Sequence, residues 1–460
     1  MRLFFIILSL LAFQGCATKS HKNLEPTKQT HPSTHMLNAN LHTSASPSSP
    51  SFAPSNPTQD SPTANPSPLP GSAPSLVDAT GTSLSARKVS IDPKIGQRFI
   101  VGFYGTNIER ARIQLEPYIR DYRIGGVILF GRHSVDNITE DQKVRKDELF
   151  PGNISNDPQA LKDLIQAIQD LNADYSDIPL FIGIDQEGGL ISRLRNCGLG
   201  ATLSHQALGK EDLSKTTEEA SKIAEYLKGL GCNLNFAPVV DLALNPENTV
   251  IVKNERSFGT DPITVAAYAK AYIEAHTNAG ILCCLKHFPG HGSTTQDTHN
   301  DFTDASLSWK EIELQPYKDL ISQGVVDCIM ASHVYNKAFD TVYPASLSKA
   351  TLTDLLRDKL GYKGLIISDD LEMKALLKYY SHEEIIALSA KAGLDIFIIG
   401  NHDARREGVE RSIQELQRLY DSEEISKEAV DASYQGILEL KQKLYPQLLG
   451  TPVCEYLETN

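Results

Sequence analysis

Gly364-Leu-Ile-Ile-Ser-Asp369 and Asp395-Ile-Phe-Ile-Ile-Gly400 are the stretches that decide the fold class of this chain. Each contains an almost unbroken apolar run that is rich in isoleucine. A strand with one face in water alternates apolar and polar side chains, so a run without alternation predicts a strand buried on both faces. Such strands are typical of parallel sheets covered by helices, and a helical pattern at His382–Lys391 lies between the two stretches. The sequence therefore predicts an α/β protein.

The same alternation of strand and helix patterns runs through the chain after residue 88. We expect strands at Gln97–Tyr104, Gly126–Phe130, Pro179–Asp185, Cys232–Asp241, Ile281–His287, Cys328–Val334, Gly364–Asp369 and Asp395–Gly400. Amphipathic helical patterns occur at Pro158–Asn172, Leu213–Leu230, Pro262–Asn278, Trp309–Ser322, Lys349–Lys359, His382–Lys391, Arg405–Tyr420 and Ser426–Leu444. Eight strand-and-helix units in roughly 300 residues predict a (β/α)8 barrel of the TIM type. The alternative is an open doubly wound sheet, but Gly102-Phe-Tyr-Gly105 lacks the full spacing of the phosphate-binding turn that such a sheet normally carries.

The composition argues against several kinds of partner. The 460 residues carry a net charge of −13, and no basic cluster is interleaved with aromatic residues, so nucleic acid is not an expected partner. The seven cysteines show neither a disulfide framework nor a Cys-x-x-Cys metal pattern, and Cys283-Cys284 lies within an apolar run. We expect structural cysteines, no cofactor and a monomer.

The N-terminus has the pattern of an export signal. Residues 1–16 combine one arginine, an apolar run too short for an ordinary transmembrane helix, and a final Gly-Cys pair that is typical of bacterial lipoproteins. We expect export to the cell envelope or periplasm, with membrane contact only through a lipid anchor at Cys16; plain secretion and an uncleaved anchor are the alternatives. Residues 17–88 are rich in Ser, Pro and Thr and are predicted to be a disordered linker. Residues 89–450 remain for a single barrel domain.

Five consecutive predicted strands end in polar residues, at the end of a barrel where chemistry takes place. They are Asp185 at the end of the third strand, Asp241 of the fourth, Lys286-His287 of the fifth, His333 of the sixth and Asp369 of the seventh. Helix N-caps, at which Asp and Ser are preferred, would explain one or two of these groups but not five. We therefore expect one shared active site at the carboxyl ends of the strands.

The segment Lys286-His-Phe-Pro-Gly-His-Gly-Ser-Thr-Thr-Gln-Asp-Thr-His299 raises the question of a metal site. His287 and His291 have the i, i+4 spacing of a helical zinc site. Pro289 and Gly290 between them disfavour a helix, and no glutamate follows the first histidine as in a zincin. A loop could still bind a metal, although we expect none.

Asp297 and His299 suggest acid–base chemistry instead. An aspartate two residues before a histidine can accept the imidazole N–H, orient the ring and raise its basicity. His299 would then carry a proton at neutral pH on a mobile loop; the alternative is a solvated loop with an Asx turn at Asp297. A second carboxylate is needed for chemistry, and Asp369 is the best-placed candidate.

Together these motifs resemble glycoside hydrolase family 3, and more narrowly its bacterial β-N-acetylhexosaminidases. The resemblance extends from about Gln97 to Asn401 and rests on K-H-F-P-G-H-G-x4-D-x-H, Asp185-Gln-Glu-Gly-Gly189, Asn235-Phe-Ala-Pro-Val-Val-Asp241, Arg256-Ser-Phe-Gly259 and Ser368-Asp-Asp-Leu-Glu-Met373. It implies that Asp369 is a nucleophile, that His299 is an acid/base and that Asp297 supports it. It also implies sugar-binding roles for Asp185, Arg193, Arg256, Lys286 and His287.

The implied activity is that of a retaining exo-β-N-acetylglucosaminidase that releases terminal N-acetylglucosamine from peptidoglycan fragments. A β-glucosidase or β-xylosidase of the same family is one alternative, but it would usually have a second α/β domain with a carboxylate acid/base. A non-catalytic cell-wall-binding lipoprotein is the other, and it would not need both Asp369 and His299. Three departures from the family pattern, at Leu190, Asn300-Asp-Phe and Lys253-Asn-Glu255, predict altered loop shapes and sugar contacts. His333 could contact the sugar or only line the site.

Overall fold

The barrel is visible in a computed structural model, which describes residues 90–131, 152–299, 301–401 and 407–446. Its strands are β1 (Phe99–Gly102), β2 (Gly126–Leu129), β3 (Phe181–Ile184), β6 (Leu234–Asn235), β7 (Leu282–Phe288), β9 (Cys328–Ala331), β11 (Leu365–Ser368) and β12 (Phe397–Ile399). They pair in parallel in the order β11-β9-β7-β6-β3-β2-β1-β12. A single parallel bridge between Ile367 and Ile396 links the two ends of this sheet, so the barrel is nearly closed. The predicted α/β barrel is therefore confirmed, whereas the proposed signal peptide and the proposed linker lie outside the described residues.

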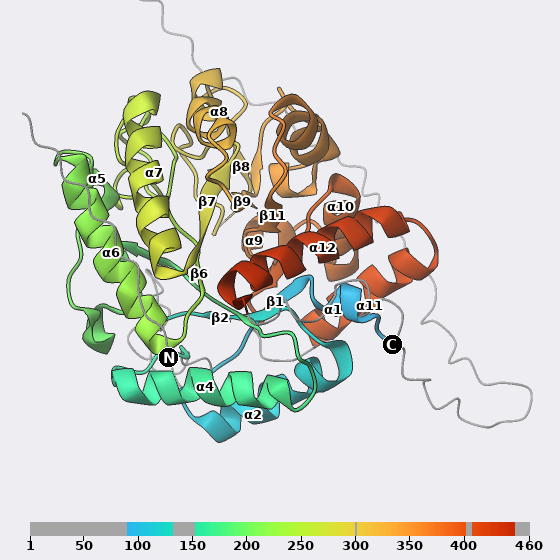
Figure 1. Ribbon diagram of the computed structural model, residues 1–460. Coiled ribbons are helices and arrows are strands. Elements are labelled where there is room, and N and C mark those ends of the chain that lie inside the picture. Colours follow the sequence, from blue (N-terminus) through green and yellow to red (C-terminus); the bar gives the residue numbers. More distant parts are fainter. Residues whose placement is uncertain (1–89, 132–151, 300, 402–406, 447–460) are drawn as a thin grey trace, which may run out of the picture. The chain divides into compact units, whose positions relative to one another are not determined.

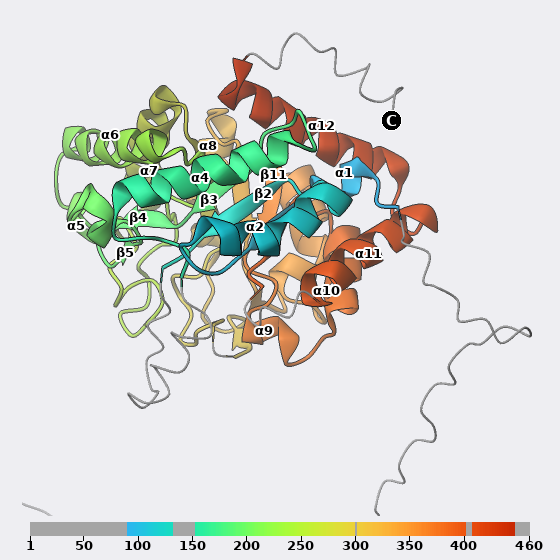
Figure 2. The same cartoon turned by 90° about the horizontal axis from the view of Figure 1, so that it is seen from below.

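Helices cover the outside of the strands (Figure 1). They include α2 (Ile108–Pro117), α4 (Pro158–Ala173), α6 (Leu213–Leu230), α7 (Pro262–Ala279), α8 (Gln315–Ser322), α10 (His382–Ala392), α11 (Glu407–Asp421) and α12 (Lys427–Leu444), with a further helical segment at Ala350–Lys359. Short helices α1 (Pro93–Gly96), α5 (His205–Leu208) and α9 (Lys374–Leu377) lie in the connections. Figure 2 shows α4 beside α2, two helices that contact each other. In the described part of the chain, no helix is both long enough and apolar enough to cross a membrane.

The helix ends follow from the sequence. Helix α7 begins after Asp261, whose side chain accepts the Thr264 N–H at 2.8 Å, and Pro262 takes the first helical position, where no N–H is required. It ends at Gly280, which adopts a left-handed φ of 76° that a side chain would disfavour. The predicted helix Trp309–Ser322 divides into a short 3-10 turn at Glu311–Leu314 and helix α8.

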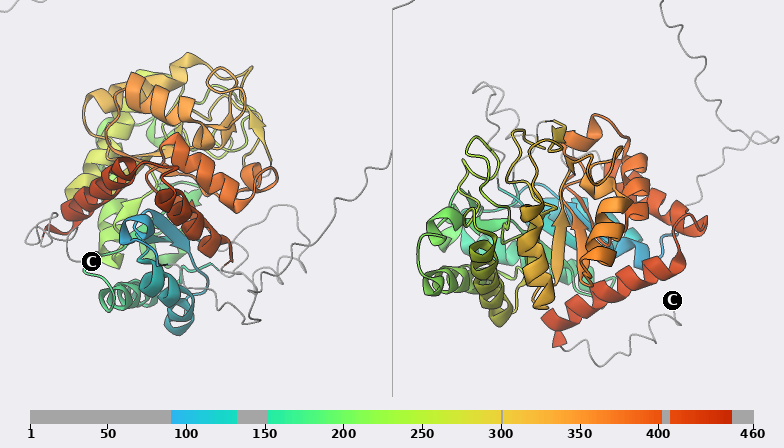
Figure 3. Two further views of the ribbon diagram at one scale, coloured as in Figure 1. Left: turned by 90° about the vertical axis from the view of Figure 1, so that its right-hand side faces the viewer. Right: turned by 90° about the horizontal axis from the view of Figure 1, so that it is seen from above.

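The apolar runs are buried on both faces, as predicted. Leu365 and Ile367 point into the barrel with Phe181, Leu282 and Met330, while Ile366 packs outward against the helices. Ile437 and Leu440 of α12 belong to the same inner cluster. Figure 3 shows α12 across one end of the barrel and the long loops at the other. The carboxyl ends of the strands therefore carry the loops, and α12 covers the amino ends.

The described cysteines are core residues. Cys197, Cys232, Cys283, Cys284 and Cys328 are buried free thiols. Cys283 packs in the outer core and Cys284 in the barrel interior, because successive residues of a strand face opposite sides. Cys16 and Cys454 lie outside the described residues.

Candidate active site

The polar groups that follow the strands lie together at the carboxyl end of the barrel. Lys286 of β7 donates from Nζ to Oδ1 of Asp185, which follows β3, at 2.6 Å. His287 lies next to Asp241, which is in the loop that follows β6. Asp369 directly follows β11, and its backbone N–H donates to the carbonyl oxygen of Ala331 at the end of β9. The parallel strands thus bring residues that are far apart in sequence onto one face.

A buried ion-pair network forms the floor of this face. Glu187, on the short strand β4 (Gln186–Gly188), accepts two parallel bonds from Arg256 at 2.8 and 2.9 Å and pairs with Lys286 Nζ at 2.7 Å. Burial alone would raise the pKa of the Glu187 carboxyl, but the two cations hold it well below its usual range. Sequence reasoning assigned no role to Glu187, although it stands inside the Asp185-Gln-Glu-Gly-Gly189 motif. The sequence feature that could have identified Glu187 is a carboxylate next to two glycines just after a strand.

His287 is oriented by two neighbours. Its Nδ1 lies 2.7 Å from Oδ2 of Asp241, and its Nε2 lies 3.2 Å from an Arg256 amino nitrogen. Because a guanidinium can only donate, Nε2 must accept, and the ring proton must be on Nδ1 facing Asp241. These two contacts fix the orientation of the His287 ring.

Asp369 is half-buried and surrounded by histidines. Burial by itself would raise the pKa of the carboxyl, but His333, His287 and His299, together with the N–H of Asp370, hold the pKa below its usual value. The Asp370 N–H donates to Oδ1 of Asp369 at 2.8 Å. This carboxylate is ionised at neutral pH and can act as a nucleophile.

His299 lies on the loop after β7 and forms a dyad with Asp297. Its Nδ1 lies 2.7 Å from Oδ1 of Asp297, and its backbone N–H donates to the same oxygen at 2.8 Å. Desolvation would lower the pKa of the imidazole, but Asp297 and Asp369 raise it above the ordinary 6.5. The side chain is 63% exposed, so the outer nitrogen is open to a ligand. The ring can therefore hold a proton at neutral pH and pass it outward.

His291, which the sequence left without a role, holds the loop together. Its Nδ1 lies 2.7 Å from the Thr294 hydroxyl and its Nε2 lies 3.5 Å from the Thr298 hydroxyl. Its backbone N–H donates to Asp241 at 2.9 Å. Burial lowers the pKa of the ring to about 4, so it is neutral. Across the described ranges, no group of three or more His, Cys, Asp or Glu residues could hold a metal ion.

His333 lies next to Asp369 and contacts the backbone of the following residue, Asp370. Its Nε2 lies 2.8 Å from the carbonyl oxygen of Asp370 and its Nδ1 lies 2.8 Å from the Ser346 hydroxyl. A carbonyl only accepts, so Nε2 carries the proton and Nδ1 accepts from Ser346. Burial lowers the pKa of this ring. His333 therefore fixes the backbone next to Asp369.

Arg193 is the predicted residue that stands apart. It follows β5 (Ile191–Ser192), is exposed, and makes no hydrogen bond or ion pair within the described ranges. Leu190, at the turn between β4 and β5, is 60% exposed. The structure therefore brings together Asp185, Arg256, Lys286, His287, Asp297, His299 and Asp369, but joins Arg193 to none of them by a polar contact.

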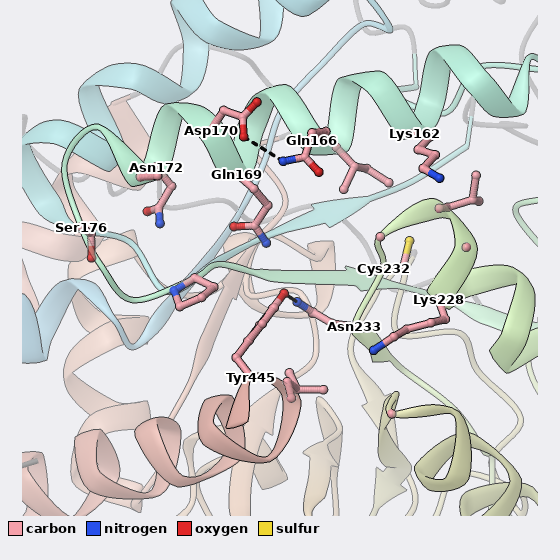
Figure 4. A pocket seen from close by; sticks show the side chains of 18 of the residues that line it. Lys162, Gln166, Gln169, Asp170, Asn172, Ser176, Lys228, Cys232, Asn233 and Tyr445 are labelled. Atoms are coloured by element: carbon pink, nitrogen blue, oxygen red, sulfur yellow. Dashed lines mark hydrogen bonds between the residues drawn. The ribbon is translucent and has the colours of Figure 1, made fainter. Parts of the chain in front are cut away.

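A cavity of about 720 Å³ lies at the opposite end of the barrel (Figure 4). Its polar lining includes Lys162, Gln166, Gln169, Asp170, Lys228, Asn233 and Tyr445. Several of these groups already bond to each other: Gln166 donates to Asp170 at 2.8 Å, and Asn233 donates to the Tyr445 hydroxyl at 2.9 Å. None of the predicted site residues lines it. Because barrels carry their chemistry at the carboxyl ends of the strands, this cavity is not the candidate site.

The fold and the site define a (β/α)8-barrel protein with acid–base groups at the carboxyl ends of its strands. A sequence model described as the glycosyl hydrolase family 3 N terminal domain matches residues 90–440. The chain belongs to this family, as predicted.

Relatives and solved structures agree with this assignment. Beta-hexosaminidase A of Pseudoalteromonas piscicida is 32% identical over 358 residues, which are 72% of this chain and 55% of that protein. Beta-hexosaminidase LpqI of Mycobacterium tuberculosis is 34% identical over 60% of this chain and 71% of its own length. A family 3 β-N-acetylglucosaminidase structure from Paenibacillus sp. str. FPU-7 matches with a TM-score of 0.67 and 31% identity, covering 79% of this chain and 63% of that one. The chain thus spans little more than half of the first of these relatives.

Proposed function

We propose that this chain is a retaining exo-β-N-acetylglucosaminidase that releases terminal N-acetylglucosamine. The observation that carries the proposal is the pairing of Asp369, whose pKa is lowered, with His299, whose pKa is raised, on one face of the barrel. An ionised carboxylate and a protonated acid are the two groups that a double displacement at a sugar requires. The relatives named β-hexosaminidase and β-N-acetylglucosaminidase support the choice of sugar.

In the first step, Asp369 attacks the anomeric carbon of the terminal sugar. The bond to the leaving oxygen breaks, and His299 gives its proton to that oxygen as the covalent glycosyl-enzyme forms. His299 is then neutral. In the second step it takes a proton from water, the water oxygen attacks the anomeric carbon, and Asp369 leaves as a carboxylate. Two displacements at one carbon retain its configuration.

Using a histidine as the acid has an electrostatic consequence. A carboxylate acid/base beside Asp369 would place two negative charges together, and each would oppose ionisation of the other. The protonated imidazole instead favours the ionised form of Asp369. Asp297 maintains this arrangement because its charge favours the imidazolium.

The sugar is held by the polar floor of the site. Asp185 accepts from sugar hydroxyls, while Arg256, Lys286 and His287 bind hydroxyl or acetamido oxygens. Lys286 has 3% of its side chain exposed and Arg256 has 9%. Both side chains are therefore held in one conformation by their surroundings. Arg193, which is exposed and unbonded within the described ranges, can move to meet a sugar.

We further propose that the natural substrates are peptidoglycan fragments and that the enzyme is exported and lipid-anchored at Cys16. The Gly-Cys pair at the end of the apolar N-terminal run supports the anchor. A relative from Arthroderma benhamiae named as a secreted glycosyl hydrolase, 32% identical over 280 residues, supports export. Labelling of the protein with a fatty-acid analogue in a bacterial host, with loss of the label in Cys16→Ser, tests the lipid anchor.

The activity is tested with purified protein and two aryl glycosides, the β-N-acetylglucosaminide and the β-glucoside. We expect faster cleavage of the first, and an initial product with the β configuration by proton NMR. Faster cleavage of the glucoside would favour the β-glucosidase alternative, and no cleavage of either would favour a binding protein. Initial α product would overturn the retaining mechanism. A large loss of activity on adding a chelator would contradict the metal-free chemistry.

A further inference from the structure

Glu313 is a buried carboxylate that the chemistry above does not use. It lies in the 3-10 turn Glu311–Leu314 and is 1% exposed. No cation is paired with it in the described part of the chain, and the charged or titratable groups that face it are Asp241 and Tyr317. Burial, helped by Asp241, raises the pKa of its carboxyl to about 7. Burying a carboxylate without a cation is unfavourable unless other donors satisfy it.

Those donors come from the loop that carries His299. Ser293 donates its hydroxyl to Oε1 at 2.6 Å, and the Gly292 N–H donates to Oε2 at 3.1 Å. A third donor, the Lys310 N–H, lies 3.4 Å from Oε1 and belongs to the same turn as Glu313. The loop approaches closely here, since a side chain on Gly290 would meet the Glu313 Cβ at 2.7 Å. Glu313 therefore holds the first part of the loop at two successive residues.

The contacts continue from this anchor toward the dyad. Thr294, next to Ser293, contacts His291 through its hydroxyl, and Asn248 donates to the Thr294 carbonyl oxygen at 3.0 Å. His291 in turn reaches Thr298, the residue between Asp297 and His299. His299 is only six positions after Ser293 in the sequence. A short segment with several hydrogen bonds therefore connects the contacts of Glu313 to the residues next to the imidazole.

We propose that Glu313 is a positioning residue that fixes the start of the loop and so sets where His299 delivers its proton. This inference rests on the proposed glycosidase activity. It goes beyond it, because Glu313 touches neither the dyad nor the floor of the site. General acid catalysis contributes about 10²- to 10⁴-fold, and a misplacement of about 1 Å can cost about 10²-fold.

The test uses Glu313→Gln, because the amide group fills the same space but keeps only one acceptor oxygen. One of the two loop bonds is then lost. The matched control is Glu311→Gln, two residues away, whose carboxyl is 76% exposed and lies 3.6 Å from Lys318. Each variant is compared on two β-N-acetylglucosaminides, one with an alkyl leaving group that needs protonation and one with a dinitrophenyl leaving group that does not.

We expect Glu313→Gln to lower kcat/KM by about 10- to 100-fold for the alkyl glycoside and by less than about 3-fold for the dinitrophenyl glycoside. Glu311→Gln should change neither, and His299→Ala should show the same selective loss as Glu313→Gln. A purely structural role for Glu313 would lower both rates equally. Equal losses, or no loss, would overturn the proposal.

Two further measurements cover other outcomes. If Glu313→Gln folds poorly, Ser293→Ala removes the shortest loop bond while leaving Glu313 in place, and it should show the same selective loss on a smaller scale. Amide hydrogen exchange across residues 292–298 should be faster in both variants than in the wild type and in Glu311→Gln. Unchanged exchange would overturn the anchoring. Because exchange needs no substrate, a wild type that cleaves no glycoside would refute the glycosidase proposal and still leave the anchoring decided.

Discussion

Asp369 and His299 have pKa values that are shifted in opposite directions by groups around them. Histidines at strand ends and a backbone N–H lower the pKa of the carboxyl, while Asp297 raises the pKa of the imidazole. Both shifts act against desolvation, so they arise from specific neighbours and not from burial. The role of each residue therefore depends on neighbouring side chains that can be changed singly.

The first prediction concerns Asp369. Asp369→Asn keeps the volume but removes the nucleophile, so hydrolysis of the aryl β-N-acetylglucosaminide should fall by about 10³-fold or more. Asp358→Asn changes an exposed carboxylate in the same way and should retain full activity. Melting curves check that both variants are folded. Activity near the wild-type level in Asp369→Asn would require a different nucleophile.

The second prediction concerns pH. The acid form of His299 is needed for the first step, so kcat/KM should be high below its raised pKa and fall as pH increases through that value, above 6.5. Asp297→Asn can still accept the ring N–H but lacks the charge that favours the imidazolium. The alkaline limb of the profile should therefore move to lower pH. A limb that stays in place would mean that another group titrates there.

At the scale of elements, ion pairs connect the hairpin of β4 and β5 to strand β7. Glu187 of β4 is the common partner of Lys286 in β7 and of Arg256 in the connection between β6 and α7. Its carboxylate is 2% exposed, so water cannot replace it if it is lost. The network holds three separate segments in one arrangement.

The third prediction follows from this network. Glu187→Gln removes the carboxylate that pairs with both buried cations and leaves Asp185, bonded to Lys286, and Asp241, near Arg256, as their counter-charges. Removing one partner of a buried pair typically costs about 3–5 kcal/mol. The free energy of unfolding from urea titration should fall by about that amount, and KM should rise because the cations reorient. Glu218→Gln, at an exposed pair with Lys215, should leave both quantities unchanged. Unaltered stability in Glu187→Gln would show that the network contributes little.

At the scale of the whole barrel, the two ends have different tasks. Asp369 and His299 lie at the carboxyl ends of the strands, whereas α12 packs across the amino ends. Lys441 of α12 is completely buried there, and its Nζ donates to Gln97 Oε1 at 2.7 Å and to the Gly125 carbonyl oxygen at 2.8 Å. Changes at this end should affect stability without affecting catalysis.

The fourth prediction tests that separation. Burial lowers the pKa of Lys441 well below 10.5, so between the two values the unfolded chain binds more protons than the folded one. The contribution of Lys441 to stability therefore rises with pH across that window. Lys441→Met should lack this contribution. The free energy of unfolding of the wild type should therefore rise relative to that of the variant as pH increases to 10.5. Its kcat/KM should equal that of the wild type, and a large loss would mean that α12 reaches the site.

The apolar runs and the strand-end motifs were sufficient to predict the barrel and the residues that gather at one end. Runs such as Leu365–Ile367 report burial on both faces, which is a local property of the strand. Parallel strands then place every carboxyl end on the same face. The prediction was less accurate for strand length: Cys232–Asp241 was expected, but only Leu234–Asn235 is a regular strand, since Pro238 has no N–H to donate to a ladder.

By itself, the sequence determined the α/β barrel, the family and the candidate pair Asp369 and His299, because periodicity and short motifs are written in neighbouring residues. Apart from Asp297, which the spacing had placed beside His299, only the tertiary structure showed the partners of the site residues. It showed that Glu187 pairs with Arg256, that Glu313 accepts a hydrogen bond from the loop of His299, and that His291 contacts Thr294 within that loop. The contacts of Glu187 and Glu313 join residues from different segments of the chain, and the contact of His291 depends on how its loop folds. Their geometry exists only in the folded protein. No spacing along the chain records such a distance.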